Sequence, residues 1–252
     1  MVCMAISCAL SFVLPIALLL YFKIKKGADL LPFFVGCAVM LLFAFILERA
    51  AHGIILGSPA GAVIQGNLWL YALYGGLMAG LFEETGRLLA FKTVLHARQS
   101  QDINALMYGA GHGGFEAMVI LGITSINNLI YSVMINSGNT AALTESLSGD
   151  LLAQVEQVIQ ALSTTPSYLF LLGAVERIFA IVLHLAFSVL VWFAVKYGKR
   201  FLYPLAIALH FAVDALTVIV SGLGAPVVLL EALVGVMAFI TAGIAWKVWK
   251  EA

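Results

Sequence analysis

Two adjacent glutamates and an arginine stand inside an apolar run of this sequence, LFEETGRLLAF, as Glu83, Glu84 and Arg87. A carboxylate in a poorly hydrated place has its charged form disfavoured, so it can accept a proton from water near neutral pH. Glu83 and Arg87 are four residues apart in the order that favours an ion pair on a helix. One arginine cannot fully pair with two carboxylates. The stretch therefore predicts a general base, and leaves open which of the two glutamates it is.

Three histidines later in the chain have the chemistry to assist such a base: His112, His184 and His210. Imidazoles orient water or donate hydrogen bonds to the oxyanion that forms when a carbonyl is attacked. Alternatively, these three histidines with a carboxylate would give zinc the roughly four nitrogen and oxygen ligands it prefers. The chain has no H-E-x-x-H motif. Hydrolysis of an amide by a glutamate-activated or metal-activated water is the chemistry these residue types predict, with zinc as the candidate cofactor.

The composition indicates where these residues lie. The chain has 252 residues, of which 63% are hydrophobic and 10% charged, and its mean hydropathy is +1.06. Soluble domains carry about 25% charged residues. The formal net charge is zero and no lysine or arginine cluster is interleaved with aromatics, which excludes nucleic acid as a partner. We expect an integral membrane protein whose partners are membrane lipids and a peptide or membrane-protein substrate.

Runs of about 20 mostly apolar residues predict membrane-spanning helices, and the chain has about seven of them. We expect an all-α bundle forming one membrane domain over 1–252, with a polar loop at 137–166 and a first helix that is a retained anchor. Basic residues gather on one side of the predicted bundle, which places the N-terminus outside and the C-terminus in the cytoplasm. The predicted spans are 2–22, 30–50, 67–95, 103–122 (extending towards 136), 167–196, 201–221 and 225–247.

Counting from the predicted cytoplasmic ends places Glu84, His112, His184 and His210 at one depth, roughly 14–18 Å into the membrane at the helical rise per residue. Ionised groups at that depth cost at least about 2.5 kcal/mol each, so a cluster of them predicts a functional site. Glu176 and Arg177 are assigned to ion pairing between helices, and Glu48 to the end of the second span. The candidate catalytic residues are Glu83, Glu84, Arg87, His112, Glu116, His184, His210 and Asp214.

These motifs resemble those of the YhfC-type membrane peptidases: EETGR from Glu83, GHGGFE around His112, ER followed by H-x-x-x-S at His184, and H-x-x-x-D at His210. They are more distantly similar to CAAX-protease, bacteriocin-processing and PrsW-type intramembrane proteases. The resemblance implies an intramembrane peptidase in a bacterial plasma membrane. It also implies Glu83 as the base, tuned by Glu84 and Arg87, with His112, His210 and Asp214 assisting.

Two other functions use the same residue types. Layers of glutamate, histidine and aspartate also form proton relays in ion-coupled transporters, although such transporters often carry internal repeats and none is evident here. A non-catalytic membrane scaffold that resembles these proteases is the second alternative.

Overall fold

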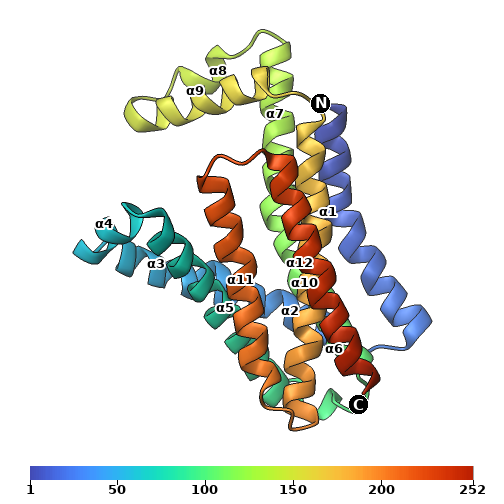
Figure 1. Ribbon diagram of the computed structural model, residues 1–252. Coiled ribbons are helices and arrows are strands. Elements are labelled where there is room, and N and C mark those ends of the chain that lie inside the picture. Colours follow the sequence, from blue (N-terminus) through green and yellow to red (C-terminus); the bar gives the residue numbers. More distant parts are fainter. Residues whose placement is uncertain (252) are drawn as a thin grey trace.

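The computed structural model describes residues 1–251, and every regular element in that part of the chain is a helix (Figure 1). A helix satisfies its backbone hydrogen bonds internally, as a lipid-embedded chain requires. The predicted all-α membrane fold is confirmed. The elements are α1 (Val2–Leu20), η1 (Tyr21–Lys25), α2 (Leu31–Val39), η2 (Met40–Glu48), α3 (Arg49–Leu56), α4 (Pro59–Gln65), α5 (Leu68–Lys92), η3 (His96–Arg98), α6 (Ile103–Ala117), η4 (Met118–Ile123), α7 (Thr124–Asn136), α8 (Ala141–Thr144), α9 (Gly149–Thr164), α10 (Leu169–Lys196), α11 (Leu202–Gly222) and α12 (Val227–Lys250).

Six helices are long and apolar enough to cross a membrane, and three of them join several elements through π-helical turns. The 25-residue α5 also occupies a predicted span, but its glutamates, arginine and glycines lower its hydropathy. The count of seven spans and the orientation of the termini stay predictions. The six ranges are Val2–Lys25, Leu31–Leu56, Ile103–Asn136, Leu169–Lys196, Leu202–Gly222 and Val227–Lys250.

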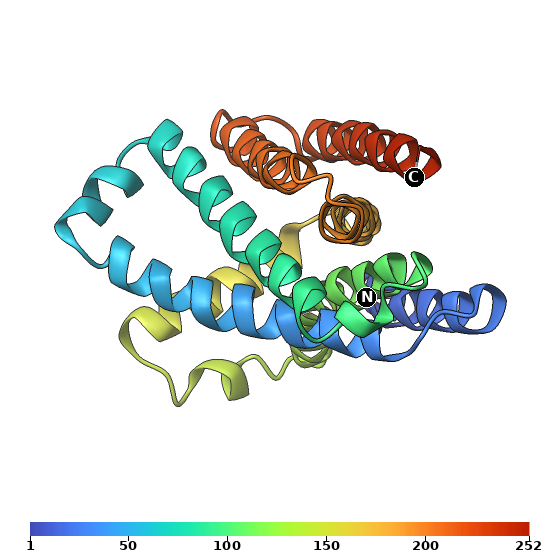
Figure 2. The ribbon, with the colours of Figure 1, turned by 90° about the horizontal axis from the view of Figure 1, so that it is seen from below.

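The second long helix, Leu31–Leu56, continues beyond its predicted end at residue 50. It is steeply inclined to the other helices (Figure 1). Seen from below, this helix and α5 are close where α2 lies and diverge towards α3 and α4 (Figure 2). Glu48, predicted to end the span, therefore lies within a helix and is buried.

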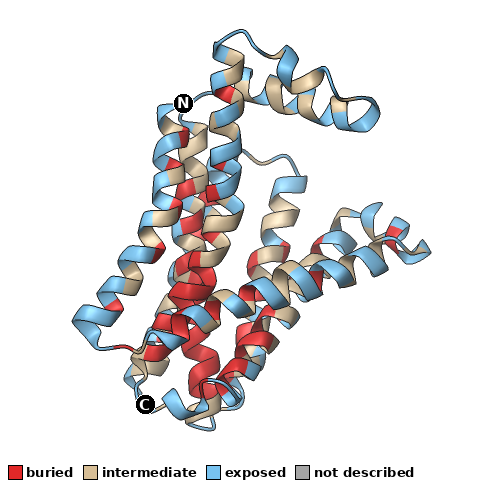
Figure 3. Ribbon diagram, turned by 180° about the vertical axis from the view of Figure 1, so that it is seen from behind, coloured by how far each residue is buried: buried red, intermediate tan, exposed pale blue. Residues whose placement is uncertain are grey.

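The helix α10 is the centre of the bundle. Of its most apolar 18-residue window 67% is buried, against 17–33% for the other five candidate spans. It packs against α1, α5, α6, α11 and α12. Buried residues concentrate in the half of the bundle where the C-terminus lies (Figure 3). The polar stretch 137–166 holds α8 and α9, and α9 lies across the opposite end (Figure 1).

Candidate active site

Glycines set the distance between α5 and α11, which carry the two glutamates and His210. A Cβ added at Gly76 would lie 2.6 Å from the carbonyl oxygen of Phe211, and one at Gly80 would lie 3.0 Å from that of Ile207. Both positions therefore need a residue without a side chain. The close approach, typical of small-xxx-small motifs in membrane helices, brings the next turn of α5 against His210.

A second close approach joins α6 to α10. A Cβ at Gly109 would lie 2.8 Å from the carbonyl oxygen of His184, and one at Gly113 would lie 2.8 Å from Cδ2 of the same histidine. The imidazole of His184 thus lies directly against the backbone of α6. His112, on the same helix, has its ring centroid 5.0 Å from that of His184.

Glu83 lies at the meeting point of three imidazoles. Its Oε2 is 3.0 Å from Nε2 of His112 and 3.8 Å from Nδ1 of His184. Its Oε1 is 4.0 Å from Nε2 of His210. The other ring nitrogen of His112 lies 3.4 Å from the Tyr108 hydroxyl. Glu83 is therefore the carboxylate that faces the histidines.

Glu84 and Arg87 form a separate, fully buried ion pair. Both side chains have 0% exposure, and Nη1 of Arg87 bonds Oε1 of Glu84. The same carboxylate oxygen is 2.8 Å from Nδ1 of His210, while Nη2 of Arg87 is 3.2 Å from Nδ1 of His184. The predicted pairing of Glu83 with Arg87 is wrong. Arg87 instead bonds Glu84, three residues before it, and its other amino group lies against His184, the imidazole that Glu83 also faces.

His184 is held on its outer side by a second charged group. Its Nε2 lies 2.9 Å from Oε2 of Glu116, and Oε1 of Glu116 accepts a 2.8 Å hydrogen bond from Arg177. Arg177 also bonds Glu176. The prediction of an ion pair between helices at Arg177 is therefore confirmed, with Glu116 of α6 as the partner from the other helix.

His210 is orientated by Glu84 and faces the cluster with its other nitrogen. Because Glu84 accepts at Nδ1, the N–H of the neutral ring lies there and the lone pair lies on Nε2. That nitrogen is 3.5 Å from Oδ2 of Asp214, whose side chain is 36% exposed. The ring stacks on Phe187, with centroids 4.9 Å apart. Asp214 lies at the edge of the site. Glu116 is also partly exposed, whereas the other six candidates are buried.

A cavity of about 130 Å³ opens on this cluster. That is room for about four water molecules at 30 Å³ each. Helices α5, α6, α10, α11 and α12 all contribute to its lining, which joins carboxylates and imidazoles to apolar side chains such as Phe187 and Val213. The eight predicted site residues are thus brought together, and their catalytic roles stay a prediction.

The chemistry of the donors fits a metal ion. Glu83, His112 and His184 each offer one ligand atom, and these atoms lie within 4.8 Å of one another. Two imidazole nitrogens and a carboxylate oxygen form a known catalytic zinc set. On His184 the nitrogen that faces away bonds Glu116, which is the carboxylate–histidine support common behind metal ligands. His210, predicted as a ligand, lies outside this group of three, and Glu83 takes its place.

Two buried carboxylates were not among the predicted site residues. Glu48 is 3.2 Å from Nε2 of His52, whose Nδ1 is 2.7 Å from the Tyr74 hydroxyl. Glu231 on α12 is buried, and its Oε2 has no hydrogen-bond partner within residues 1–251. Each is a single glutamate in an apolar helix. A charged residue in such a helix is costly, and this is the signal by which both glutamates could have been found in the sequence. His52 is thus the middle residue of a hydrogen-bonded chain from Glu48 to Tyr74.

Comparison with known proteins identifies the family. The model of the YhfC intramembrane metalloprotease family matches residues 10–239. The uncharacterized membrane protein YhfC of Bacillus subtilis (strain 168) is 39% identical over 209 residues, which make up 82% of this chain and 80% of that protein. No solved structure matches the chain. Because the family model covers most of the sequence and the relative is similar over the same extent, this integral membrane protein belongs to the YhfC intramembrane metalloprotease family.

Proposed function

We propose that this protein is an intramembrane metallopeptidase, which hydrolyses a peptide bond in or near the bilayer. The observation that carries the proposal is the convergence of Glu83, His112 and His184 on one point inside the membrane domain. The description of the family as metalloproteases supports it. In this proposal these three side chains hold a divalent metal ion of the zinc class. Such an ion polarises a carbonyl and lowers the pKa of water.

His210 is the proton carrier in this proposal. Its Nδ1–H donates to Glu84, which fixes the tautomer and leaves Nε2 able to accept a proton from the attacking water. The Nε2 atom lies 4.0 Å from Glu83 and 3.5 Å from Asp214, so it faces the space where that water must lie. The protonated imidazole then gives its proton to the nitrogen of the leaving amine. Glu84 supports the transient positive charge on the ring.

The other charged residues have positioning roles. Glu116 accepts a hydrogen bond from Nε2 of His184 and fixes the ring, while Arg177 holds Glu116. Arg87 neutralises Glu84 in a place from which water is excluded. If the site works without a metal, Glu83 itself takes the proton from water, as its resemblance to the CAAX-type base implies. Dependence on metal therefore decides between the two roles of Glu83.

The test is cleavage of synthetic single-span peptides reconstituted with the purified protein, with the cut bonds located by mass spectrometry. We expect cleavage by the zinc-loaded wild type, loss after dialysis against a chelator and recovery when zinc returns. Glu83→Gln should lose at least 100-fold in rate, because it removes the carboxylate ligand of the proposed metal. If the site works without a metal it removes the base, and loss of a general acid–base group costs about 10²–10⁴. The matched control is Glu231→Gln, the same substitution at a buried glutamate of α12 outside the cluster.

Cleavage that survives in Glu83→Gln, or that is lost equally in both variants, would contradict the proposal. Cleavage that is insensitive to the chelator but lost in Glu83→Gln would assign Glu83 as the base in place of the metal. A proton flux across vesicles that contain the wild type and not Glu83→Gln, without any cut peptide, would favour a transporter.

A further inference from the structure

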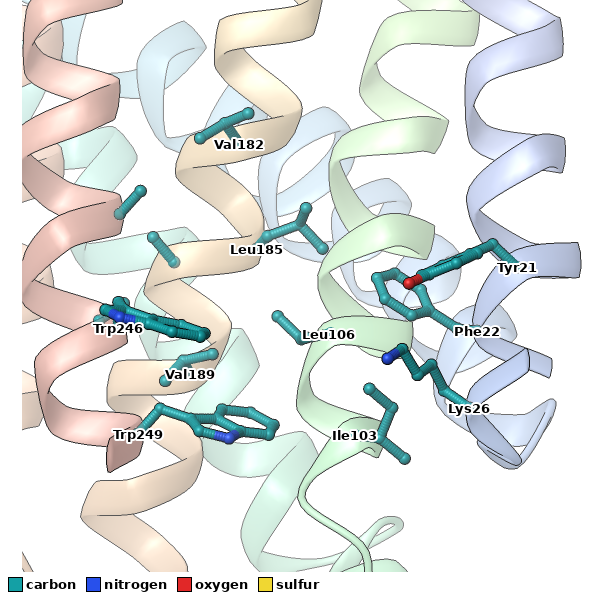
Figure 4. Close-up of a pocket in the computed structure, with 13 residues that line it drawn as sticks. Tyr21, Phe22, Lys26, Ile103, Leu106, Val182, Leu185, Val189, Trp246 and Trp249 are labelled. Carbon is teal, nitrogen blue, oxygen red and sulfur yellow. The ribbon is translucent and has the colours of Figure 1, made fainter. Parts of the chain in front are cut away.

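A second and larger cavity lies away from the candidate active site, between η1, α6, α10 and α12. Its volume is about 580 Å³, which is in the range of sites that bind small molecules. Figure 4 shows Tyr21 and Phe22 on one side of this groove, and Trp246 and Trp249 on the other. The side chains of α6 and α10 that line it are aliphatic. The groove is therefore shaped and lined for a long apolar group.

Lys26 is the one charged residue in the lining of the groove. Its amino group points into the gap (Figure 4) and lies 5.8 Å from the centroid of the Tyr21 ring. Among residues 1–251, no carboxylate lies within ion-pair distance of Lys26, and this is also true of its neighbours Lys23 and Lys25, which do not line the groove. A lysine without a carboxylate partner at an apolar groove is complementary to an anion attached to an apolar chain.

The groove opens where the membrane domain meets water. Trp246 is 60% exposed, and Nζ of Lys250 lies 4.8 Å from its ring centroid. Tryptophan and lysine at helix ends mark the level of lipid headgroups. Lys26 follows the end of η1, and Trp246 and Trp249 lie in the last turns of α12, near the C-terminus. Figure 4 shows them on opposite sides of the groove.

We propose that this groove binds an anionic phospholipid, with an acyl chain along the apolar lining and the phosphate at Lys26. A zwitterionic lipid brings the same chains, but its own cation offsets the phosphate charge that Lys26 would neutralise. Basic pockets between membrane helices bind anionic headgroups in this way. The site is independent of the proposed peptidase function, because none of its lining residues belongs to the active-site cluster.

The test uses lipids that quench tryptophan fluorescence. The purified protein is reconstituted in phosphatidylcholine nanodiscs containing a small fraction of either dibrominated phosphatidylglycerol or dibrominated phosphatidylcholine. The signal from the groove is the quenching seen in the wild type and lost in the double variant Trp246→Phe, Trp249→Phe. We expect phosphatidylglycerol to be preferred about fivefold at equal mole fraction, the contribution of one basic residue near a membrane surface.

Lys26→Gln should reduce that preference to nearly one. The matched control is Lys23→Gln, an exposed lysine on η1, three residues before Lys26, that does not line the groove, and it should keep the preference. Equal quenching of the wild type by both lipids would overturn the proposal. A preference for phosphatidylglycerol that survives in Lys26→Gln would also overturn the proposal. So would a preference that Lys23→Gln removes to the same extent as Lys26→Gln, since the preference would then reflect general attraction of anionic lipids to the basic end of the protein.

Discussion

Glu83 and Glu84 are neighbours on α5, but their carboxylates have different partners. Glu83 Oε2 lies 3.0 Å from Nε2 of His112, whereas Glu84 bonds Arg87 and lies 2.8 Å from Nδ1 of His210. Successive residues of a helix point about 100° apart, so two helices packed on different sides of α5 can each receive one carboxylate. Glu83 bonds His112 of α6 and faces the rings of His184 and His210, whereas Glu84 bonds His210 of α11 from its other nitrogen.

The first prediction follows from this division of partners. Glu84→Gln should lower the free energy of unfolding by about 3–5 kcal/mol, because it leaves the buried guanidinium of Arg87 without its carboxylate. Glu83→Gln should cost much less, because its partners are imidazoles that can be neutral. The measurement is thermal unfolding of both variants in the same detergent.

A double variant provides the control for that prediction. Replacing both members of a buried ion pair by residues without charge is often close to neutral, so Glu84→Gln combined with Arg87→Met should regain most of the lost stability. Equal loss of stability in Glu83→Gln and Glu84→Gln would show that the two carboxylates do not differ in this way.

The second prediction concerns Gly113. A methyl group there would lie 2.8 Å from Cδ2 of His184 and 3.0 Å from its Cβ, so the imidazole must move in Gly113→Ala. Displacement of a reacting group by about 1 Å can cost about 100-fold in rate. We expect a folded protein with at least tenfold slower peptide cleavage and weaker zinc binding, measured by rate and by titration.

Gly75→Ala is the matched control. A Cβ at Gly75 would meet no atom within 4 Å, and alanine is favoured over glycine in helices by roughly 0.5–1 kcal/mol. This variant should keep its activity and be equally or slightly more stable. Gly113→Ala with full activity would mean that the position of the His184 ring does not limit the reaction.

The positions of the helices were largely predictable from hydropathy. The expected span 167–196 corresponds to Leu169–Lys196, and 201–221 corresponds to Leu202–Gly222. The second span was predicted to end at Glu48 and Arg49, because charges usually mark the end of an apolar run. Instead the helix continues to Leu56, and Glu48 finds a partner in His52 one turn later. Hydropathy does not show such a partner, because it assigns a value to each residue by its type and takes no account of contacts between residues.

The members of the polar cluster could also be predicted from the sequence, because charged side chains inside membrane spans are costly and need polar partners. The contacts between them could not be predicted. Whether Arg87 pairs at three or four residues' distance depends on which face of α5 meets α10 and α11. Gly76 and Gly80 set the packing of α5 against α11, and Gly109 and Gly113 set the packing of α6 against α10. The spacing of four residues in the sequence shows that Gly76 and Gly80 share one face of their helix, and that Gly109 and Gly113 share one face of theirs. It does not show which helix packs on either face.

The third prediction concerns the metal. The wild type should bind one zinc ion per chain, and His112→Ala, His184→Ala and Glu83→Ala should lose it, because each removes one of the three converging ligand atoms. His210→Ala should retain the ion while losing cleavage. The measurement is elemental analysis after dialysis in buffer with limiting zinc. Loss of zinc in His210→Ala with retention in Glu83→Ala would instead support the ligand set of three histidines.

The last prediction concerns Asp102, which lies in the connection before α6, outside the spans. Burial alone would raise the pKa of its carboxyl, but hydrogen bonds from Lys196 at 2.7 Å, Tyr197 at 2.7 Å and Trp192 at 3.0 Å hold the pKa below its usual value. A carboxyl whose pKa is lower in the folded state stabilises the fold at pH values above the unfolded-state pKa of about 3.9. This contribution is lost as the pH falls through the folded-state pKa.

Asp102→Asn should therefore be less stable than the wild type by about 1 kcal/mol at pH 7. The difference should shrink as the pH falls below about 4, where the carboxyl of the unfolded chain takes up a proton before that of the folded protein does. Unfolding temperatures measured from pH 3 to pH 7 would show this convergence, with Glu156→Gln on the exposed α9 as a control that stays parallel to the wild type. A difference that is constant across that range would mean that Asp102 contributes through packing and not through its charge.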